Sequence, residues 1–327
     1  MTLSRHASAC VVLAAMATGL ACSPHSAHAQ TPFPSRTVTI VLPYNAGGGT
    51  DAAARSIAKG LTQIWGQSVV VENVAGADGL IGTQKAARAR PDGYTVLMSV
   101  PNLLLFKHSK NDGLFDATAA LSPVSLVAKY PVVLIASKAS GIRTVADMVA
   151  KCKGPDGRCS WGSGEQFSWL AGVSAFGAMG VDAVNVPYRG TAPVVNDVLG
   201  GHLTLGVGAL ASPLPHHKSG GLRVVAALGD ARSDSIPDVP TLKNAGIHGV
   251  AVGDGWYGLF APKGMPVELL AAWQKGLQQV QKDSSVAASL AAVNALPVFS
   301  SPAEFSAQVA DDQKAFDALI AKHPLPQ

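Results

Sequence analysis

Short β-branched, apolar runs alternate with helix-like segments along most of this chain, and that alternation limits the folds it can adopt. The run at 36–44 predicts a buried strand, and the segment after it has apolar residues at helical spacing up to Gly66. Further strands are predicted at 68–73 and 93–100, with a helix over 81–90 between them. Such a βαβαβ unit predicts a mostly parallel sheet with helices on both faces.

A second series of strands and helices, similar in size, runs from 130 to 229. A further strand is predicted at 255–262, and helices close the chain. The chain passes between the two series near 127–131 and again near 253–256. We therefore expect an α/β protein with two lobes. Lobe 1 would consist of residues 30–129 and 255–327, and lobe 2 of residues 130–254.

The N-terminus, residues 1–29, has the features of a secretory signal peptide. Arg5 and His6 precede an apolar run that is too short for a membrane span, and an A-x-A sequence precedes Gln30. Cleavage there predicts a periplasmic protein. The alternative of a lipid anchor at Cys22 is less favoured, because Gly19 fits poorly at the third position before that cysteine.

Without the leader, the only cysteines are Cys152 and Cys159, on either side of a Pro-Asp-Gly turn. The compartment outside the membrane is oxidising, so this pair predicts a structural disulfide. Closing so short a loop should stabilise the fold by about 2–3 kcal/mol. A redox or metal-binding pair is the alternative, but the C-x-x-C spacing and a nearby His are absent from the sequence.

Composition and motifs argue against several classes of protein. The chain is 48% hydrophobic and 14% charged with a net charge of +4, which indicates a compact globular protein and no nucleic-acid partner. The G-x-G-x-x-G match at 253–258 is followed by a strand pattern, although a dinucleotide site needs a helix there. His216 and His217 lack a third metal ligand. We therefore expect no cofactor and no metal.

Three consecutive glycines, Gly47, Gly48 and Gly49, separate the first predicted strand from a helix that begins at Thr50 and Asp51. In an open parallel sheet, ligands bind beyond the carboxyl ends of the strands, where helix N-termini present free N–H groups. A flexible turn with Thr50 or Asp51 as the N-cap is the alternative, but that turn would need only one glycine. Three glycines favour backbone amides that approach an anion closely.

Similar loops of small residues recur before helices at 74–82, 161–168 and 187–193, from both predicted lobes. One helix N-terminus contributes about 0.3–1 kcal/mol to an exposed anion, whereas a micromolar complex needs about 8 kcal/mol. Several loops must therefore cooperate. The pattern predicts a small ligand, most simply a carboxylate, enclosed between the lobes.

Six segments together resemble the solute receptors of the tripartite tricarboxylate transporter family, also called the Bug family. They are "FPSRTVTIVLPYNAGGGTDAAAR", "GQSVVVENVAGADGLIGTQKAARARPDGYTVLM", "LSPVSLVAKYPVVLIAS", "VPYRGTAPVVNDVLGGHL", "PDVPTL" and "WYGLFAPKGMP". The similarity runs in unbroken order through essentially all of the predicted mature chain. It implies a two-lobed periplasmic binding protein of the flytrap, type II-like kind. Such a receptor delivers a small carboxylate to a two-component membrane permease or to a sensor.

The resemblance also implies ligand contacts. In the family the backbone of the first loop grips a ligand carboxylate, and the segment 187–193 matches a second anchoring loop, although lysine is commoner than Arg189. The chain departs from the family at 161–169, where bulky side chains replace small ones, and at Gly208, where many relatives carry an aspartate. An aromatic carboxylate thereby becomes a plausible ligand. The expected contacts are Tyr44, Asn45, Gly47, Gly48, Gly49, Thr50, Asp51, Ala77, Asp78, Ser99, Asn102, Ser163, Gln166, Ser168, Tyr188, Arg189, Gly190 and Thr191.

Two functional classes follow from these patterns. The first is a monomeric, non-catalytic receptor for a dicarboxylate, tricarboxylate, amino acid or aromatic acid. The second is an exported hydrolase or decarboxylase that acts on a small carboxylate in the same cleft, because binding-protein lobes can host catalysis. The sequence shows no G-x-S-x-G elbow and no nucleophile with an adjacent base, so the receptor is favoured.

Overall fold

The computed structural model describes residues 33–325 except 110–114, 155–156 and 158. The predicted signal peptide and Cys22 lie outside the described residues. The strands are β1 (Val38–Leu42), β2 (Val69–Asn73), β3 (Thr95–Ser99), β4 (Leu121–Tyr130), β5 (Val132–Ser137), β6 (Ser160–Ser163), β7 (Val184–Pro187), β8 (Leu205–Ala209), β9 (Leu222–Ala227), β10 (Gly255–Pro262) and β11 (Leu296–Pro297). The α-helices are α1 (Gly49–Trp65), α2 (Leu80–Ala87), α3 (Ala117–Ala120), α4 (Val145–Lys153), α5 (Gln166–Met179), α6 (Thr191–Leu199), α7 (Leu214–Lys218), α8 (Val267–Val280), α9 (Ser284–Ala292) and α10 (Pro302–Lys322). The 3-10 helices are η1 (Ala77–Gly79), η2 (Pro101–His108) and η3 (Lys138–Ser140).

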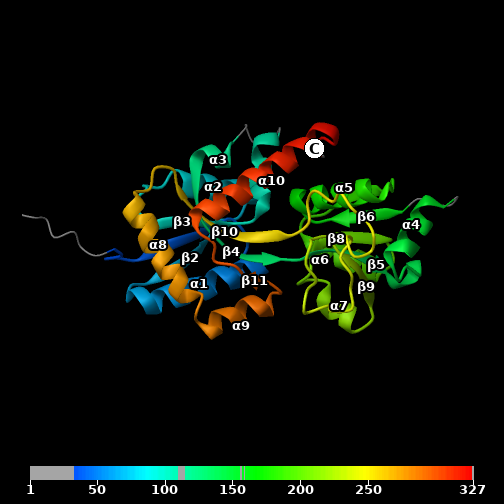
Figure 1. Ribbon diagram of the computed structural model, residues 1–327, viewed down its shortest axis with the longest axis horizontal. Coiled ribbons are helices and arrows are strands. Elements are labelled where there is room, and N and C mark those ends of the chain that lie inside the picture. The colour runs from blue at the N-terminus through cyan, green and yellow to red at the C-terminus, as the bar shows by residue number, and fades with distance from the viewer. Residues whose placement is uncertain (1–32, 110–114, 155–156, 158, 326–327) are drawn as a thin grey trace, which may run out of the picture. The chain divides into compact units, whose positions relative to one another are not determined.

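The first sheet has the strand order β11-β4-β10-β3-β1-β2 (Figure 1). Strand β1 runs parallel to both β2 and β3, as the predicted βαβαβ unit requires. Strand β10 lies antiparallel between β3 and β4, and β11 adds antiparallel to β4. The sheet is therefore mixed, with its parallel part supplied by the N-terminal unit and its antiparallel part by segments that return from elsewhere in the chain.

The second sheet has the order β7-β6-β8-β5-β9 and repeats this plan. Strand β6 runs parallel to β7 and β8, whereas β5 lies antiparallel between β8 and β9. The carboxyl ends of β6 and β7 therefore lie at the same end of the sheet, and the loops that follow them lead into α5 and α6. In a parallel sheet a ligand site is expected beyond the carboxyl ends of the strands.

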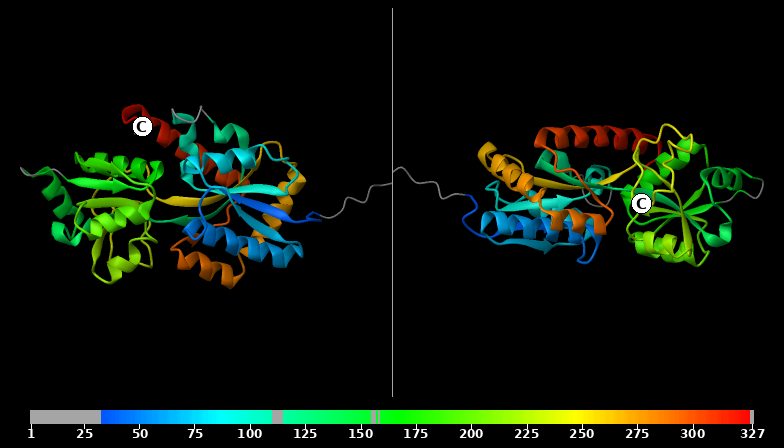
Figure 2. Two further views of the ribbon diagram at one scale, coloured as in Figure 1. Left: turned by 180° about the vertical axis from the view of Figure 1, so that it is seen from behind. Right: turned by 60° about the horizontal axis from the view of Figure 1, so that its bottom comes forward.

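Helices cover both faces of the first sheet. Helix α1 packs on β1 and β2, and α8 and α9 pack against α1. Figure 1 shows α2 and α10 on the opposite side of the sheet, and the view from behind in Figure 2 shows the same layers. Ile57 and Leu61 on α1 are fully buried between these layers. The helix ends at Gly66, whose left-handed φ of 65° lets its N–H reach Thr62.

The chain passes between the sheets twice, from β4 to β5 and from β9 back to β10. Strand β4 of the first sheet ends at Tyr130, and β5 of the second begins at Val132. The rings of Tyr130 and Tyr257 lie 4.8 Å apart, so β4 and β10 are packed together where the chain crosses. A Cβ atom at Gly255 would approach the Tyr130 ring to 2.1 Å, which explains the glycine at the start of β10. Strand β10 overlaps the G-x-G-x-x-G match at 253–258 and continues to Pro262, so a strand and not a helix follows the match.

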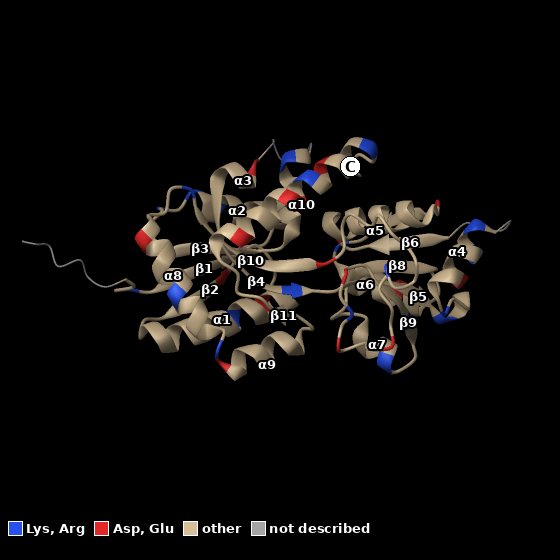
Figure 3. Ribbon diagram, viewed as in Figure 1, with Lys and Arg blue, Asp and Glu red and all other residues tan. Residues whose placement is uncertain are grey.

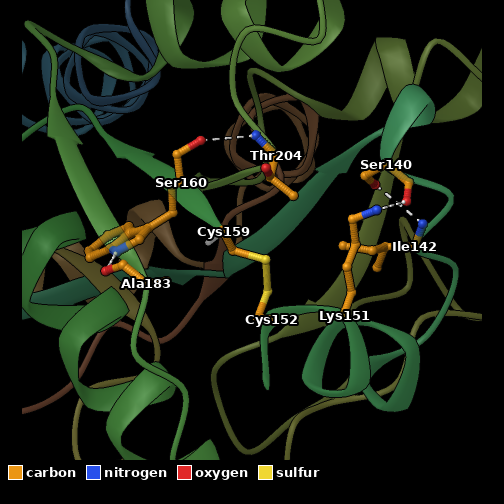
Figure 4. Close-up of a disulfide and its surroundings, with 9 residues drawn as sticks. Ser140, Ile142, Lys151, Cys152, Cys159, Ser160, Ala183 and Thr204 are labelled. Carbon is orange, nitrogen blue, oxygen red and sulfur yellow. Dashed lines mark hydrogen bonds between the residues drawn. A yellow bond between two sulfur atoms is a disulfide. The ribbon is translucent and has the colours of Figure 1, made fainter. Parts of the chain in front are cut away.

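A disulfide joins Cys152, near the end of α4, to Cys159, just before β6 (Figure 4). Both cysteines are buried. Neighbouring hydrogen bonds run from the Thr204 N–H to Ser160 Oγ at 3.4 Å and from Lys151 Nζ to the Ser140 carbonyl at 2.9 Å. The bridge therefore ties α4 to the N-terminal end of β6, which lies between β7 and β8 in the second sheet.

Charged residues of both signs are interspersed along the described elements (Figure 3). None of the helices in the described part of the chain combines the length and apolar character needed to cross a membrane.

Candidate functional site

A cavity of about 800 Å³ is lined by loops from both sheets. The loops that follow β1 and β2 supply one wall, and the loops that follow β6 and β7 supply the other. Nine of the predicted contacts line this cavity: Tyr44, Asn45, Ala77, Asp78, Ser163, Gln166, Tyr188, Arg189 and Gly190. Eight further residues complete the lining: Pro43, Ala75, Gly76, Gly79, Gly164, Glu165, Trp169 and Pro187.

The loop after β2 holds four consecutive residues in left-handed backbone conformations. Their φ angles are 132° at Gly76, 46° at Ala77, 53° at Asp78 and 102° at Gly79. Two of these residues carry a Cβ atom, and a non-glycine residue at positive φ costs of order 1–3 kcal/mol. Strain of this kind collects at ligand-binding loops, and this loop forms part of the cavity wall.

Asn102 holds that loop from behind. Its Nδ2 donates to the backbone carbonyl of Asp78 at 2.9 Å and to Asp78 Oδ2 at 3.0 Å. Its Oδ1 accepts the N–H of Phe167, at the start of α5, at 3.2 Å. Asn102 is almost fully buried and lies outside the cavity lining. It therefore positions two walls of the cavity relative to one another rather than forming a wall itself.

Ser99, another predicted contact, is fully buried at the end of β3 and is absent from the lining. The Tyr44 hydroxyl is its neighbour, and among the described residues neither oxygen has a partner with good hydrogen-bond geometry. Burial raises the pKa of Tyr44 far above its usual value. Tyr44 is thus a neutral phenol that lines the cavity, with Ser99 behind it.

The triple-glycine loop is held in place by the side chain of Asp51. Gly47 donates its N–H to Asp51 Oδ2 at 3.1 Å, and Gly48 is the N-cap of α1, which begins one residue earlier than predicted, at Gly49. The first helical bond runs from Ala52 N–H to the Gly48 carbonyl, so the N–H groups of residues 49–51 have no acceptor within the helix. Residues 47–51 are not part of the cavity lining.

Two of the three glycines in this loop have a structural reason to be there. Gly47 has a φ of 91°. A Cβ atom at Gly49 would lie 2.8 Å from the Tyr257 hydroxyl, whereas one at Gly48 would have no neighbour within 4 Å. The fold therefore requires the first and third glycines, and only the middle one is left without a structural reason.

At the start of α5, two predicted contacts have structural roles. Ser168 Oγ accepts the N–H groups of Gly164 and Glu165 at 3.0 and 3.1 Å, which caps the helix, and it is almost fully buried. Ser163 is buried at the end of β6, where its Oγ accepts from Asn185 Nδ2 at 3.1 Å. Ser163 still lines the cavity, whereas Ser168 does not.

The loop after β7 brings Tyr188, Arg189 and Gly190 to the cavity. The Tyr188 hydroxyl donates to Asp197 on α6. Burial is the main cause that raises the pKa of Tyr188 to about 12, and this hydrogen bond is the second. Thr191 begins α6 but faces the second sheet: a Cβ atom at Gly208 would lie 2.5 Å from its Cγ2. The aspartate expected in relatives at Gly208 would therefore collide with Thr191.

Glu165 is the charged residue of the cavity lining that was not among the expected contacts. It is the N-cap of α5 and lines the cavity. Burial, and then the nearby Asp78 carboxylate, raises the pKa of Glu165 to about 7. The available signal was an acid in the middle of a small-residue loop that leads into a helix. The charged groups on the cavity wall are therefore the carboxylates of Asp78 and Glu165 and the guanidinium of Arg189.

Comparison with known proteins agrees with the expected family. The family described as "Tripartite tricarboxylate transporter family receptor" (TctC) matches residues 53–325. BugT of Bordetella pertussis is 31% identical over 294 residues, which cover 88% of this chain and 89% of BugT.

Two solved structures with bound ligand are also similar. MatC of Rhodopseudomonas palustris, with bound malate, is 25% identical with a TM-score of 0.75, over 88% of this chain and 100% of that one. An R. palustris protein with adipate is 26% identical with a TM-score of 0.78, over 88% and 97% of the two chains.

Proposed function

Because the chain belongs to the TctC family of tripartite tricarboxylate transporter receptors, we propose that its cavity captures a small carboxylate between two lobes. The single observation that carries this proposal is the cavity of about 800 Å³ lined by loops of both sheets. The proposed lobes are residues 30–129 with 255–327, and residues 130–254; the separation of the strands into two sheets supports this division. Bound malate and adipate in two relatives support the ligand class.

The carboxylate would bind at the loop after β7. Arg189 supplies a positive charge there, and Gly190 is the N-cap of α6, whose first amides have no acceptor within the helix. A helix N-terminus also carries about half a positive charge. The predicted contacts that line the cavity would complete the site, and those behind it would hold its walls.

The protein would act as a monomeric receptor in the periplasm, exported by residues 1–29. It would hand the ligand unchanged to a two-component permease of the tripartite tricarboxylate type or to a sensor. An exported enzyme would consume the ligand, so chemical recovery separates the two classes. Ligand released by denaturing a saturated complex should be recovered intact and in a 1:1 ratio with protein.

A thermal-shift screen of residues 30–327 against dicarboxylates, tricarboxylates, amino acids and aromatic acids tests the proposal. A ligand at 100 times its Kd adds about 2.7 kcal/mol of stability, which raises Tm by several degrees. The variant Arg189→Gln should reduce the shift, whereas Arg90→Gln, whose side chain is 83% exposed outside the lining, should not. A flat screen with folded, ligand-free protein would refute the proposed function.

A further inference from the structure

The proposed carboxylate cavity contains two acids of its own, one from each side. Asp78 lies in the left-handed loop after β2, and Glu165 lies at the start of α5, after β6. Both line the cavity, and they are close enough for the Asp78 carboxylate to disfavour ionisation of Glu165. A ligand with two carboxylates would add two negative charges to a wall that offers one guanidinium, Arg189. Like charges in a partly enclosed site repel strongly.

Glu165 occupies the position where an anion would otherwise bind. As the N-cap of α5, it places its own carboxylate at the positive end of that helix. Among the described residues no Lys, Arg or His lies within salt-bridge distance of this carboxylate. A half-buried acid without a cationic partner favours a ligand that supplies one.

The surroundings of Glu165 also suit a cation. Tyr44, Trp169 and Tyr188 line the same cavity, and aromatic faces attract ammonium groups. The Tyr44 hydroxyl is buried without a partner of good geometry among the described residues, and it can accept a hydrogen bond from a ligand N–H group. The side chain of Asn102, which fixes Asp78, is itself buried.

The cavity therefore has ends of opposite sign. Arg189 and the N-terminus of α6 form the positive end, and Glu165 with Asp78 forms the negative end. We propose that this cavity selects a ligand that carries a protonated nitrogen as well as a carboxylate, and that Glu165 is the specificity-determining residue for the nitrogen. This inference rests on the proposed receptor function and narrows its ligand class to aminated carboxylates.

Matched pairs of probes test the inference. L-aspartate and succinate, L-glutamate and glutarate, and L-phenylalanine and 3-phenylpropanoate differ within each pair only by the amino group. Thermal shifts with all six should show at least one amine-bearing member that binds tenfold or more tightly than its partner. Equal or tighter binding by the deaminated partners would overturn the inference and leave the receptor function standing. No shift with any of the six would count against both.

The variant Glu165→Gln locates the selectivity. It keeps the size of the side chain and should weaken binding of the amine-bearing probe at least tenfold while leaving its deaminated partner unaffected or more tightly bound. Glu268→Gln is the matched control, because Glu268 is an exposed acid in the first turn of α8, outside the cavity. Unchanged selectivity in a folded Glu165→Gln protein would overturn the assignment.

Proton linkage gives a readout that a structural role would not move. A bound ammonium should favour the ionised form of Glu165, so binding at pH 7 should release protons. The binding enthalpy measured by calorimetry should therefore differ between phosphate and Tris buffers, in the direction that corresponds to proton release. Proton uptake would mean that Glu165 binds the ligand as a neutral acid, which contradicts the inference. The groups that act electrostatically on Glu165, or line the same cavity, are Asp78, Arg189, Tyr44, Tyr130, Tyr188 and Tyr257. Burial raises the pKa of each of these tyrosines, so none of them titrates near pH 7.

Discussion

The Asp51 carboxylate accepts the backbone N–H of Gly47 at 3.1 Å and thereby closes the loop between β1 and α1. The same oxygen accepts Arg55 Nε at 2.9 Å, and the other accepts Asn73 Nδ2 at 3.0 Å. Burial works to raise the pKa of Asp51, but these three donors hold it below its usual value. An acid in a motif expected to touch ligand thus organises the loop itself.

Replacing Asp51 with Asn should lower the free energy of unfolding by about 1–3 kcal/mol at pH 7, because a buried acceptor for three donors is lost. The pKa of Asp51 is depressed in the folded state, so its contribution is present above the unfolded value of 3.8 and is lost as pH falls through the folded value. Urea unfolding at pH 7 and pH 3 should show a difference between variant and wild type that shrinks in acid. Glu72→Gln, in an exposed pair, should have little effect.

The middle and last glycines of the loop should respond differently to a side chain. Gly48→Val should leave Tm nearly unchanged, because the added Cβ would have no neighbour within 4 Å, and it should abolish binding if this backbone approaches the ligand. Gly49→Val should lower Tm, because its Cβ would lie 2.8 Å from the hydroxyl of the buried Tyr257. Thermal melts and binding assays on the two variants decide the matter. Unaltered affinity in Gly48→Val would remove this loop from the site.

The fold was largely predictable because its parallel units carry strong local signals. Apolar runs predicted β1, β2 and β3 to within two residues at each end, and Gly66 ended α1 as expected. Strand β4 was not predicted, since serine and proline in "LSPVSLVAKY" break its pattern, and its pairing with β10 depends on contacts far apart in sequence. The antiparallel edges of both sheets likewise come from long-range pairing that no local pattern encodes.

The site was only partly predictable. Loops that follow parallel strands converge by topology, which is why residues such as Tyr44 and Arg189 line one cavity. Sequence position does not say which way a side chain points in a loop, so Ser168 became a helix cap and Thr191 packed on the sheet. Glu165 was missed because the burial that shifts its pKa is a property of the assembled walls.

Removing Asn102 should loosen both walls that it joins. Asn102→Ala deletes two hydrogen bonds to Asp78 and one from the Phe167 N–H, all with a buried side chain. The free energy of unfolding should fall by about 1–3 kcal/mol, and affinity for any hit from the screen should fall as well. Chemical unfolding and calorimetry measure the two effects. Asn196→Ala, at an exposed position on α6, serves as the control, and equal behaviour of the two variants would contradict a positioning role for Asn102.

The disulfide between Cys152 and Cys159 closes a loop with a sequence separation of 7. Replacing both cysteines with serine should lower the free energy of unfolding by about 2–3 kcal/mol, chiefly by freeing the unfolded chain. Reduced wild-type protein should unfold at the same urea concentration as the double variant. Ligand affinity should be retained, since neither cysteine lines the cavity. A redox or metal-binding role would instead require the reduced pair to change affinity or to bind a metal.

Asp254 should make stability fall as pH rises. It lines a second cavity of about 510 Å³ beside the crossing strands, and burial raises its pKa to about 6 although Lys129 works to lower it. A raised folded-state pKa means that its contribution is fully present below the unfolded value of 3.8 and is lost as pH rises through about 6. Asp254→Asn should therefore gain stability relative to wild type between pH 4 and pH 7.5. Thermal melts across that pH range measure the gain, with Asp234→Asn as an exposed control. Parallel plots of Tm against pH for Asp254→Asn and wild type would show that Asp254 does not cause the fall in stability.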